Sequence, residues 1–264
     1  MHSAERDGKA RSMVDRALAL LTAFTPADAE LSLAELSRRT GIPKPTVHRL
    51  LNELAPWGMV DKTPAGVRLG MGLFELGARA PAQLTLREAA GPALADLAEA
   101  TRETVHLAVL QERDVVYVQK LPFKGGPSVR SRLGGRMPAY CTAVGKAMLA
   151  FSPPEVVHTA LDGPLRRRTP YTVIAPGLIE RELRAVREHG FAEEHEESTR
   201  GIACVAAPVV DRDGRASAAV SITGWADRID TRRLAPAVRT AALGIGRALS
   251  PGPGVHGLRR PDRS

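Results

Sequence analysis

The chain has 264 residues, a hydrophobic content of 44% and a formal net charge of +8. This length suits two globular domains, and the charge favours an anionic partner without locating it. No run of about eighteen apolar residues occurs, so we expect no membrane span. The polar start MHSAERDGKARS lacks the apolar core of a secretory signal. With only two cysteines and no CxxC pair, the reducing cytoplasm is the expected location.

The first periodic segment starts at Ser12 and predicts a helix that completes a small helical core. Its expected core-facing residues are Val14, Leu18, Leu21 and Phe24.

Residues 32–57 predict two short amphipathic helices joined by a tight turn. Ser32 and Glu35 have the spacing of a capping box, and Gly41 is placed to end the first helix in a left-handed conformation. Pro45 lies in the first turn of the second helix, where its missing N–H is harmless. The buried stripe of the second helix consists of Val47, Leu50, Leu51 and Leu54.

The outer face of the second helix carries polar side chains suited to DNA. The candidates for contact on this helix are Lys44, Pro45, Thr46, His48, Arg49 and Asn52. This layout is that of a helix-turn-helix, whose second helix enters the major groove. We expect Thr46, His48 and Arg49 to reach base edges and Lys44 to hold phosphate. Amphipathic helix pairs also occur in proteins that bind no DNA, and their charged faces are then only solvated.

Residues 59–69 predict a β-hairpin with its turn at residues 63–66. A hairpin directly after the second helix is typical of the wing of a winged helix. Lys62 and Arg68 in this hairpin, and Arg38 in the first motif helix, are expected to contact phosphates.

The rest of the chain predicts an α+β domain. A linker helix is expected first, followed by strand pairs that helices interrupt, a pattern that indicates an antiparallel sheet. The expected strands are 103–110, 115–119, 129–133, 202–210 and 216–224, and the expected helices are 84–101, 142–151, one after Pro154, 179–189 and 231–249. We divide the chain into a winged helix-turn-helix domain (10–69), a linker helix (70–83), a second domain (84–250) and a disordered tail (251–264).

Four segments together resemble the IclR family of bacterial transcriptional regulators, over about residues 10–250. They are IPKPTVHRLLNEL, RLGMGLFELG, GGRMPAYCTAVGKAMLA and GFAEEHEESTRGIACVAAPVVDRDGRASAAVSITG. The resemblance implies a winged helix and an effector-binding and oligomerisation domain related to GAF and PAS sensors. It also implies homodimers, often paired into homotetramers, that bind a palindromic operator in double-stranded DNA. A repressor of a catabolic operon is the commoner outcome, and an activator is the alternative.

The resemblance further implies a pocket for a small organic acid, between the sheet and the loop before a short helix. The residues that match the effector positions are Ala143, Val144, Glu194, Cys204, Ser221 and Thr223. Backbone N–H groups at the helix start suit a carboxylate, and Ser221 and Thr223 alternate onto one face of their strand. Without the resemblance, Cys204 reads as an ordinary buried cysteine. For Glu193, Glu196 and Glu197, a solvated acidic loop is an open alternative to a role in the site.

An enzyme is the competing class. Cys204 and His195 could form a nucleophile and base, or a metal site together with Glu194. The sequence has no nucleophile elbow, no HExxH motif and no Gly-rich phosphate loop. We therefore expect no catalysis, no cofactor and no metal.

Overall fold

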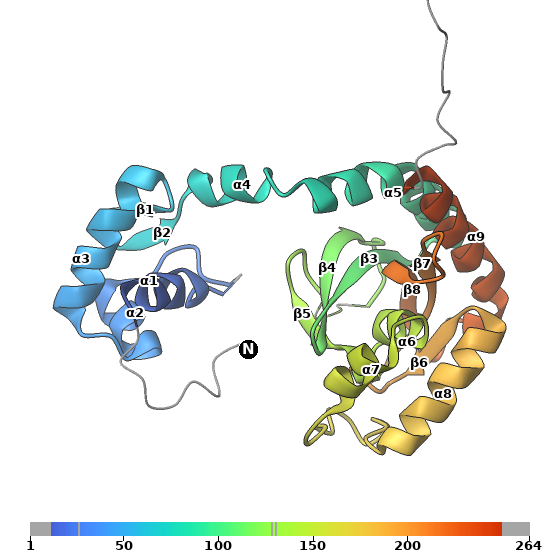
Figure 1. Ribbon diagram of the computed structural model, residues 1–264. Helices are drawn as coiled ribbons and strands as arrows, with labels where there is room; N and C mark the ends of the chain where they lie inside the picture. The colour runs from blue at the N-terminus through green and yellow to red at the C-terminus, as the bar shows by residue number, and fades with distance from the viewer. Residues whose placement is uncertain (1–11, 26, 128, 130, 250–264) are drawn as a thin grey trace, which may run out of the picture. The chain divides into compact units, whose positions relative to one another are not determined.

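The computed structural model describes residues 12–25, 27–127, 129 and 131–249 (Figure 1). The chain forms two compact units that divide between Leu84 and Thr85. The expected tail, 251–264, lies outside the described residues. Among the helices that are described, none combines the length and the apolar character needed to cross a membrane.

The N-terminal unit is a small helical bundle with a hairpin. Its elements are α1 (Met13–Thr22), α2 (Leu33–Thr40), α3 (Lys44–Leu54), the 3-10 turn η1 (Ala55–Trp57), β1 (Val60–Lys62), β2 (Val67–Leu69) and α4 (Met71–Gly77). Ser32 Oγ caps α2 by accepting the N–H of Glu35 at 3.2 Å, and Gly41 ends it with φ of 71°, as predicted. Because β1 and β2 pair antiparallel, the predicted hairpin is confirmed.

The core of this unit differs from the prediction at α1. Leu20 is fully buried, whereas Val14 and Leu18 are 68% and 54% exposed. The helix is turned so that the stripe reaching the core consists of Ala17, Leu20, Leu21 and Phe24. These residues have the i, i+3, i+4, i+7 spacing, and so the assignment of Val14 and Leu18 to the core was wrong.

The C-terminal unit has three layers around one antiparallel sheet. The helices and turn are α5 (Pro81–Thr101), η2 (Ala139–Cys141), α6 (Ala143–Ala150), α7 (Pro154–Leu161), α8 (Pro176–His189) and α9 (Thr231–Leu249). The strands are β3 (Thr104–Gln111), β4 (Asp114–Leu121), β5 (Arg136–Pro138), β6 (Ala192–His195), β7 (Ile202–Val210) and β8 (Ala216–Trp225). Their order is β5-β4-β3-β8-β7-β6, which confirms the predicted α+β class with an antiparallel sheet.

Each face of the sheet has its own apolar core. Helices α5 and α9 cover one face, against residues such as Leu107, Val205 and Ile222. Helices α6, α7 and α8 cover the other, against Ala108 and Ala206 among others (Figure 1). All eight residues of α6 are buried, so this short helix fills the centre of the second layer.

One expected strand of this unit was wrong, and one open alternative is excluded in part. The third strand is Arg136–Pro138 instead of 129–133, and among the described residues of 129–133 none is in a strand. The Arg136–Pro138 segment pairs with β4 through Met137, which is buried. The solvated loop left open for the acidic segment does not apply to Glu193, which lies in β6 (Ala192–His195), or to Glu197, which is buried.

Candidate functional site

The outer face of α3 presents the predicted DNA-contacting side chains on the surface of the N-terminal unit. Lys44, Pro45, His48, Arg49 and Asn52 are exposed, as are Lys62 and Arg68 of the hairpin, while Thr46 is half-buried. The structure thus brings the candidates of helix and hairpin together on one small unit.

Hydrogen bonds order this surface. Lys62 Nζ donates to Asn52 Oδ1, which ties the hairpin to α3. The Asn52 amide in turn lies 3.4 Å from His48 Nδ1. The Arg49 guanidinium donates to Met13 Sδ at 3.2 Å and has a loose ion pair with Glu53 at 3.9 Å, while its side chain is 61% exposed. Lys44 has no partner among the described residues.

Two other basic residues are already paired within the chain. Arg38 makes a two-pronged contact to Glu35, at 2.8 and 2.6 Å, and Arg68 lies 3.1 Å from Asp61. The Arg38 and Arg39 hydrogen bonds lower the pKa of Glu35 to about 2. The Glu35 carboxylate therefore binds these two arginines and does not accept the Ser32 N–H, the contact that would complete the predicted capping box. Arg38 keeps its charge and a side chain that is 73% exposed, but contact with phosphate has to compete with Glu35.

The second candidate site lies where the first turn of α6 faces the sheet. Thr142 caps α6, because its Oγ1 accepts the N–H of Gly145 at 3.2 Å. Gly145 has no room for a side chain, since a Cβ there would overlap the carbonyl of Ala139 in η2. This close approach sets the start of α6, and with it Ala143 and Val144, against the sheet.

The facing side chains form two rows across the sheet. In the first row Glu194, Cys204 and Thr223 are neighbours on β6, β7 and β8. In the second row Ser221 of β8 lies opposite His106 of β3. Since side chains alternate along strands, all of them point toward α6, and the structure brings together all six residues predicted to bind an effector.

Hydrogen bonds link the two rows. Cys204 Sγ lies 3.1 Å from Thr223 Oγ1, which lies 3.4 Å from His106 Nδ1. The other ring nitrogen of His106 lies 2.7 Å from Ser131 Oγ, and the ring packs on Tyr117 with centroids 5.1 Å apart. Burial lowers the pKa of His106 to about 3, with a smaller contribution from the charge of Lys120. His106 is therefore neutral at physiological pH.

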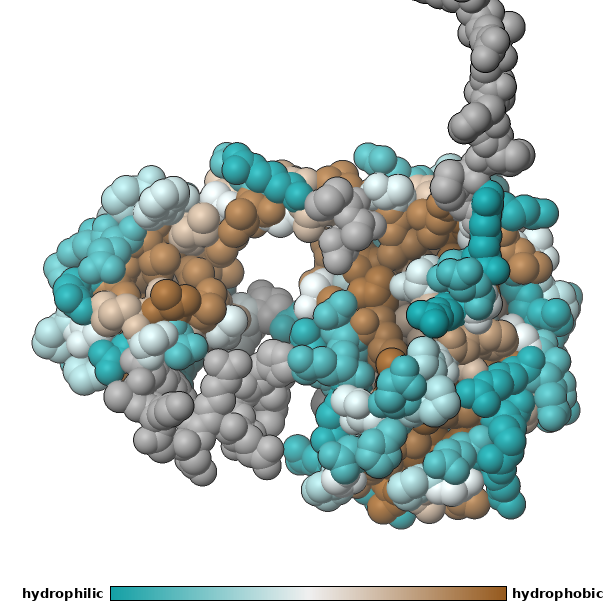
Figure 2. Space-filling view, viewed as in Figure 1, coloured by the Kyte–Doolittle hydropathy of each residue, from teal (hydrophilic) through white to brown (hydrophobic). Residues whose placement is uncertain are grey.

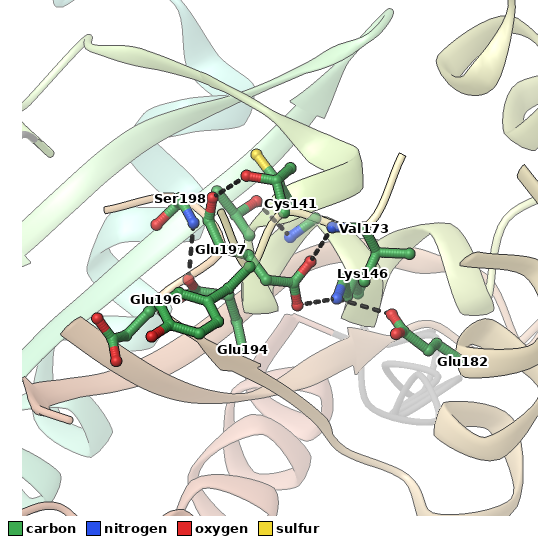
Figure 3. Close-up of polar contacts among 12 residues, drawn as sticks. Cys141, Lys146, Val173, Glu182, Glu194, Glu196, Glu197 and Ser198 are labelled. Carbon is green, nitrogen blue, oxygen red and sulfur yellow. Dashed lines mark hydrogen bonds and ion pairs between the residues drawn. The ribbon is translucent and has the colours of Figure 1, made fainter. Parts of the chain in front are cut away.

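His106, Tyr117 and a buried ion pair beside them were not predicted as site residues from the sequence. Lys146 of α6 is 2% exposed, and its ammonium contacts Glu197 and lies 2.7 Å from Glu182 Oε2 (Figure 3). Glu197 follows β6, so this pair joins the helix of the site to the loop after Glu194. The alternation of Thr104, His106 and Ala108 was a usable signal for His106, whereas nothing local marks Lys146 as the partner of Glu197.

Residues of the loop before α8 hydrogen-bond to Glu196 and to Glu197 of this ion pair. Thr172 Oγ1 donates to the carbonyl of Glu197 at 2.7 Å, and Thr169 Oγ1 donates to that of Glu196 at 2.6 Å. The N–H of Val173 donates to the Glu197 carboxylate at 3.4 Å. A cavity of about 670 Å³ lies on the outer side of Lys146, and its lining includes none of the six residues predicted to bind an effector.

The arrangement does not support the catalytic alternative. His195 is exposed and, by the alternation of β6, points away from the face that carries Glu194 and Cys204. Cys204 contacts Thr223 instead, and burial raises its pKa well above the ordinary value. Within the described residues no group of three His, Cys, Asp or Glu side chains is arranged to hold a metal ion.

Both units match known protein families. Residues 13–64 match the IclR helix-turn-helix domain, and residues 79–247 match the bacterial transcriptional regulator IclR C-terminal domain. These matches define the class of protein: a transcriptional regulator that binds DNA through a helix-turn-helix. The chain belongs to the IclR family, which confirms the resemblance seen in the sequence.

Curated relatives align over most of the chain. The HTH-type transcriptional regulator XynR of Escherichia coli is 34% identical over 242 residues, 89% of this chain and 96% of its own. The DNA-binding transcriptional repressor YiaJ of Escherichia coli is 34% identical over 82% of this chain and 80% of its own. The glycerol operon regulatory protein of Streptomyces coelicolor is 32% identical over 90% of this chain and 96% of its own.

A solved structure is similar over both units. It is an IclR homologue from Microbacterium hydrocarbonoxydans complexed with 4-hydroxybenzoate, with a TM-score of 0.84 and 29% identity. The similarity covers 90% of this chain and 99% of that one.

Proposed function

We propose that the protein is a cytoplasmic repressor of a catabolic operon, that it binds a palindromic operator, and that a small organic acid controls it. The observation that carries this proposal is the outer face of α3, whose exposed His48, Arg49 and Asn52 are ordered beside Lys62 of the hairpin. Repression is supported by the name of the YiaJ relative, and an operon target by that of the Streptomyces relative. Activation remains the alternative role.

We assign the six residues around α6 to the effector. A neighbour of the same fold binds 4-hydroxybenzoate, and here buried hydroxyl and amide groups meet at the start of a helix, where the helix dipole favours an anion. No catalytic role is assigned to Cys204 or His195.

A homodimer or homotetramer fits the surface of the N-terminal unit. Val14 and Leu18 of α1 and Met71 and Phe74 of α4 are each more than half exposed, and apolar atoms gather on this unit in Figure 2. Apolar surface of this kind is typical of protein contacts, and two copies would present two α3 helices to a palindrome.

The DNA-binding role is tested by gel-shift competition with the promoter fragment next to the gene. Arg49→Ala is expected to lose about 1–3 kcal/mol of discrimination at one base pair, because a bidentate base contact is removed. Lys62→Ala is the matched control for a phosphate contact: it should weaken all sequences alike and lower the salt slope by about one ion. An unchanged operator preference in Arg49→Ala would contradict the assignment of α3.

A further inference from the structure

The Glu194 carboxyl is buried with one oxygen left without a partner. The N–H of Ser198 donates to Oε1 at 2.8 Å, and the Cys204 thiol lies within hydrogen-bonding reach of the carboxyl. No donor among the described residues has a well-aligned hydrogen bond to Oε2. The residue is 1% exposed, so bulk solvent does not reach this oxygen. Because buried polar atoms are almost always paired, Oε2 is a place where a hydrogen-bond donor is missing.

No nearby cation is free to pair with this carboxyl. Lys146, the nearest, is held by Glu197 and Glu182, and Figure 3 shows its ammonium directed at those two carboxylates rather than at Glu194. Arg168 lies on the exposed loop before α8, where its guanidinium donates to the Ser198 carbonyl at 3.3 Å.

Apart from the Glu197 carboxylate, which is paired with Lys146, the titratable groups that face Glu194 are thiols and a phenol. Burial raises the pKa of Cys141 in η2 to about 12, and the nearby Glu194 carboxylate adds to this effect. Burial also raises the pKa of Cys204 on β7 and of Tyr117 on β4, and both groups sense the charge of Glu194. The groups that face Glu194 from β4, β7 and η2 are therefore neutral hydrogen-bonding groups at physiological pH.

Burial has the same effect on Glu194 itself. It raises the pKa of Glu194 to about 7, and the charge of Glu197 raises it further, while the Ser198 and Cys204 hydrogen bonds and the charge of Lys146 oppose the rise. The carboxyl thus exchanges its proton with solvent in the physiological range.

Backbone donors suited to an anion lie at the start of α6, the helix that packs against the strand of Glu194. The N–H groups of Gly145 and Lys146 are taken by Thr142, while those of Ala143 and Val144 have no acceptor among the described residues. A carboxylate bound to these amides would lie beside the Glu194 carboxyl, and two carboxylates sharing one site hold one proton between them.

We propose that the effector is a carboxylic acid that binds with one proton, held between its carboxylate and Glu194 Oε2. The proposal rests on the proposed effector role of this site and specifies its chemistry. The proton comes from solvent, and no covalent bond is formed. Above pH 7 the free site lacks this proton, so each further pH unit should raise the dissociation constant about tenfold.

The test is isothermal titration calorimetry on the full chain at pH 6–9, in buffers of different ionisation enthalpy. The probes are 4-hydroxybenzoate, benzoate and lactate, each compared with its primary amide. We expect binding of the acid to take up close to one proton at pH 8.5, and its dissociation constant to rise about tenfold per pH unit above pH 7.5. The dissociation constants of the primary amides should not depend on pH.

Glu194→Gln should bind the acid with a dissociation constant that does not change between pH 7 and 9. Glu193→Gln, next to it but on the other face of β6, is the matched control and should keep the wild-type slope. If an acid binds the wild type without proton uptake, the shared proton is refuted, but the effector role of the site is not. Binding by none of the three acids overturns the link together with the effector class. The pH dependence of the wild-type dissociation constant is sufficient to test the proposal. The test therefore remains decisive even if Glu194→Gln does not fold.

Discussion

Replacing Lys146 with Met tests whether the buried ion pair organises the site. Glu182 is 39% exposed and regains water when Lys146 is lost, whereas the Glu197 side chain is 9% exposed and stays buried without a partner. Removing one member of a buried pair costs about 3–5 kcal/mol. The cost has an upper limit, because Glu197 can take up a proton instead, and at pH 7.5 protonating an ordinary glutamate costs about 4 kcal/mol.

The expected loss of unfolding free energy for Lys146→Met is therefore about 3–4 kcal/mol at pH 7.5. Burial already raises the pKa of Glu197 above its ordinary value, and losing Lys146 raises it further. An acid whose pKa is raised on folding destabilises the folded state as pH rises, so the loss shrinks as pH falls, to about 1–2 kcal/mol at pH 5.5.

The assay is urea unfolding in a Trp57→Phe background, where the fluorescence reports only Trp225 of β8. Lys124→Met, at an exposed lysine, is the control and should change stability by less than about 0.5 kcal/mol. Lys146→Met combined with Glu197→Leu should recover most of the loss, since an apolar pair replaces the ionic one. A loss below about 1 kcal/mol for the single variant, or one that is equal at both pH values, would refute the reasoning.

Two further predictions concern the same site. Gly145→Ala forces a methyl group into the Ala139 carbonyl and should cost about 1–3 kcal/mol in thermal unfolding, whereas Gly177→Ala, where a Cβ meets nothing, should be close to neutral. Ser221→Ala combined with Thr223→Val should abolish release of DNA by effector in gel shifts and leave operator affinity near wild type; release at an unchanged concentration would move the effector site elsewhere.

Local patterns predicted the elements and the class of fold. The stripe of α3, the caps at Ser32 and Gly41, and the bounds of α9 all depend on neighbours within a few residues, which the sequence shows directly. The same reasoning was wrong for Val14 and Leu18, because two apolar stripes of α1 overlap and only contact with α2 and α3 decides which one is buried.

The chemistry of the second site depends on distant pairings. Glu197 meets Lys146 across 51 positions, and no periodicity signals such a pair. His106 lies opposite Ser221 because β3 pairs with β8. The alternation of polar and apolar residues along each strand does not specify this strand order. The resemblance supplied the six candidate residues, but the register was needed to show that His106 and Tyr117 lie among them.

The pairing of β3 with β8 also has a consequence for how the protein is made. The β3–β4 hairpin leaves the ribosome long before residues 216–225. Without β8 the β3 edge of the hairpin is unpaired, and α9, which covers the Val105 and Leu107 face together with α5, has not yet been made. Closing such a long loop is slow because its entropy is lost before the contacts form. A nascent chain stopped before β8 should therefore hold a folded N-terminal unit and an unfinished sheet, and competence to sense a ligand should appear only at the end of synthesis.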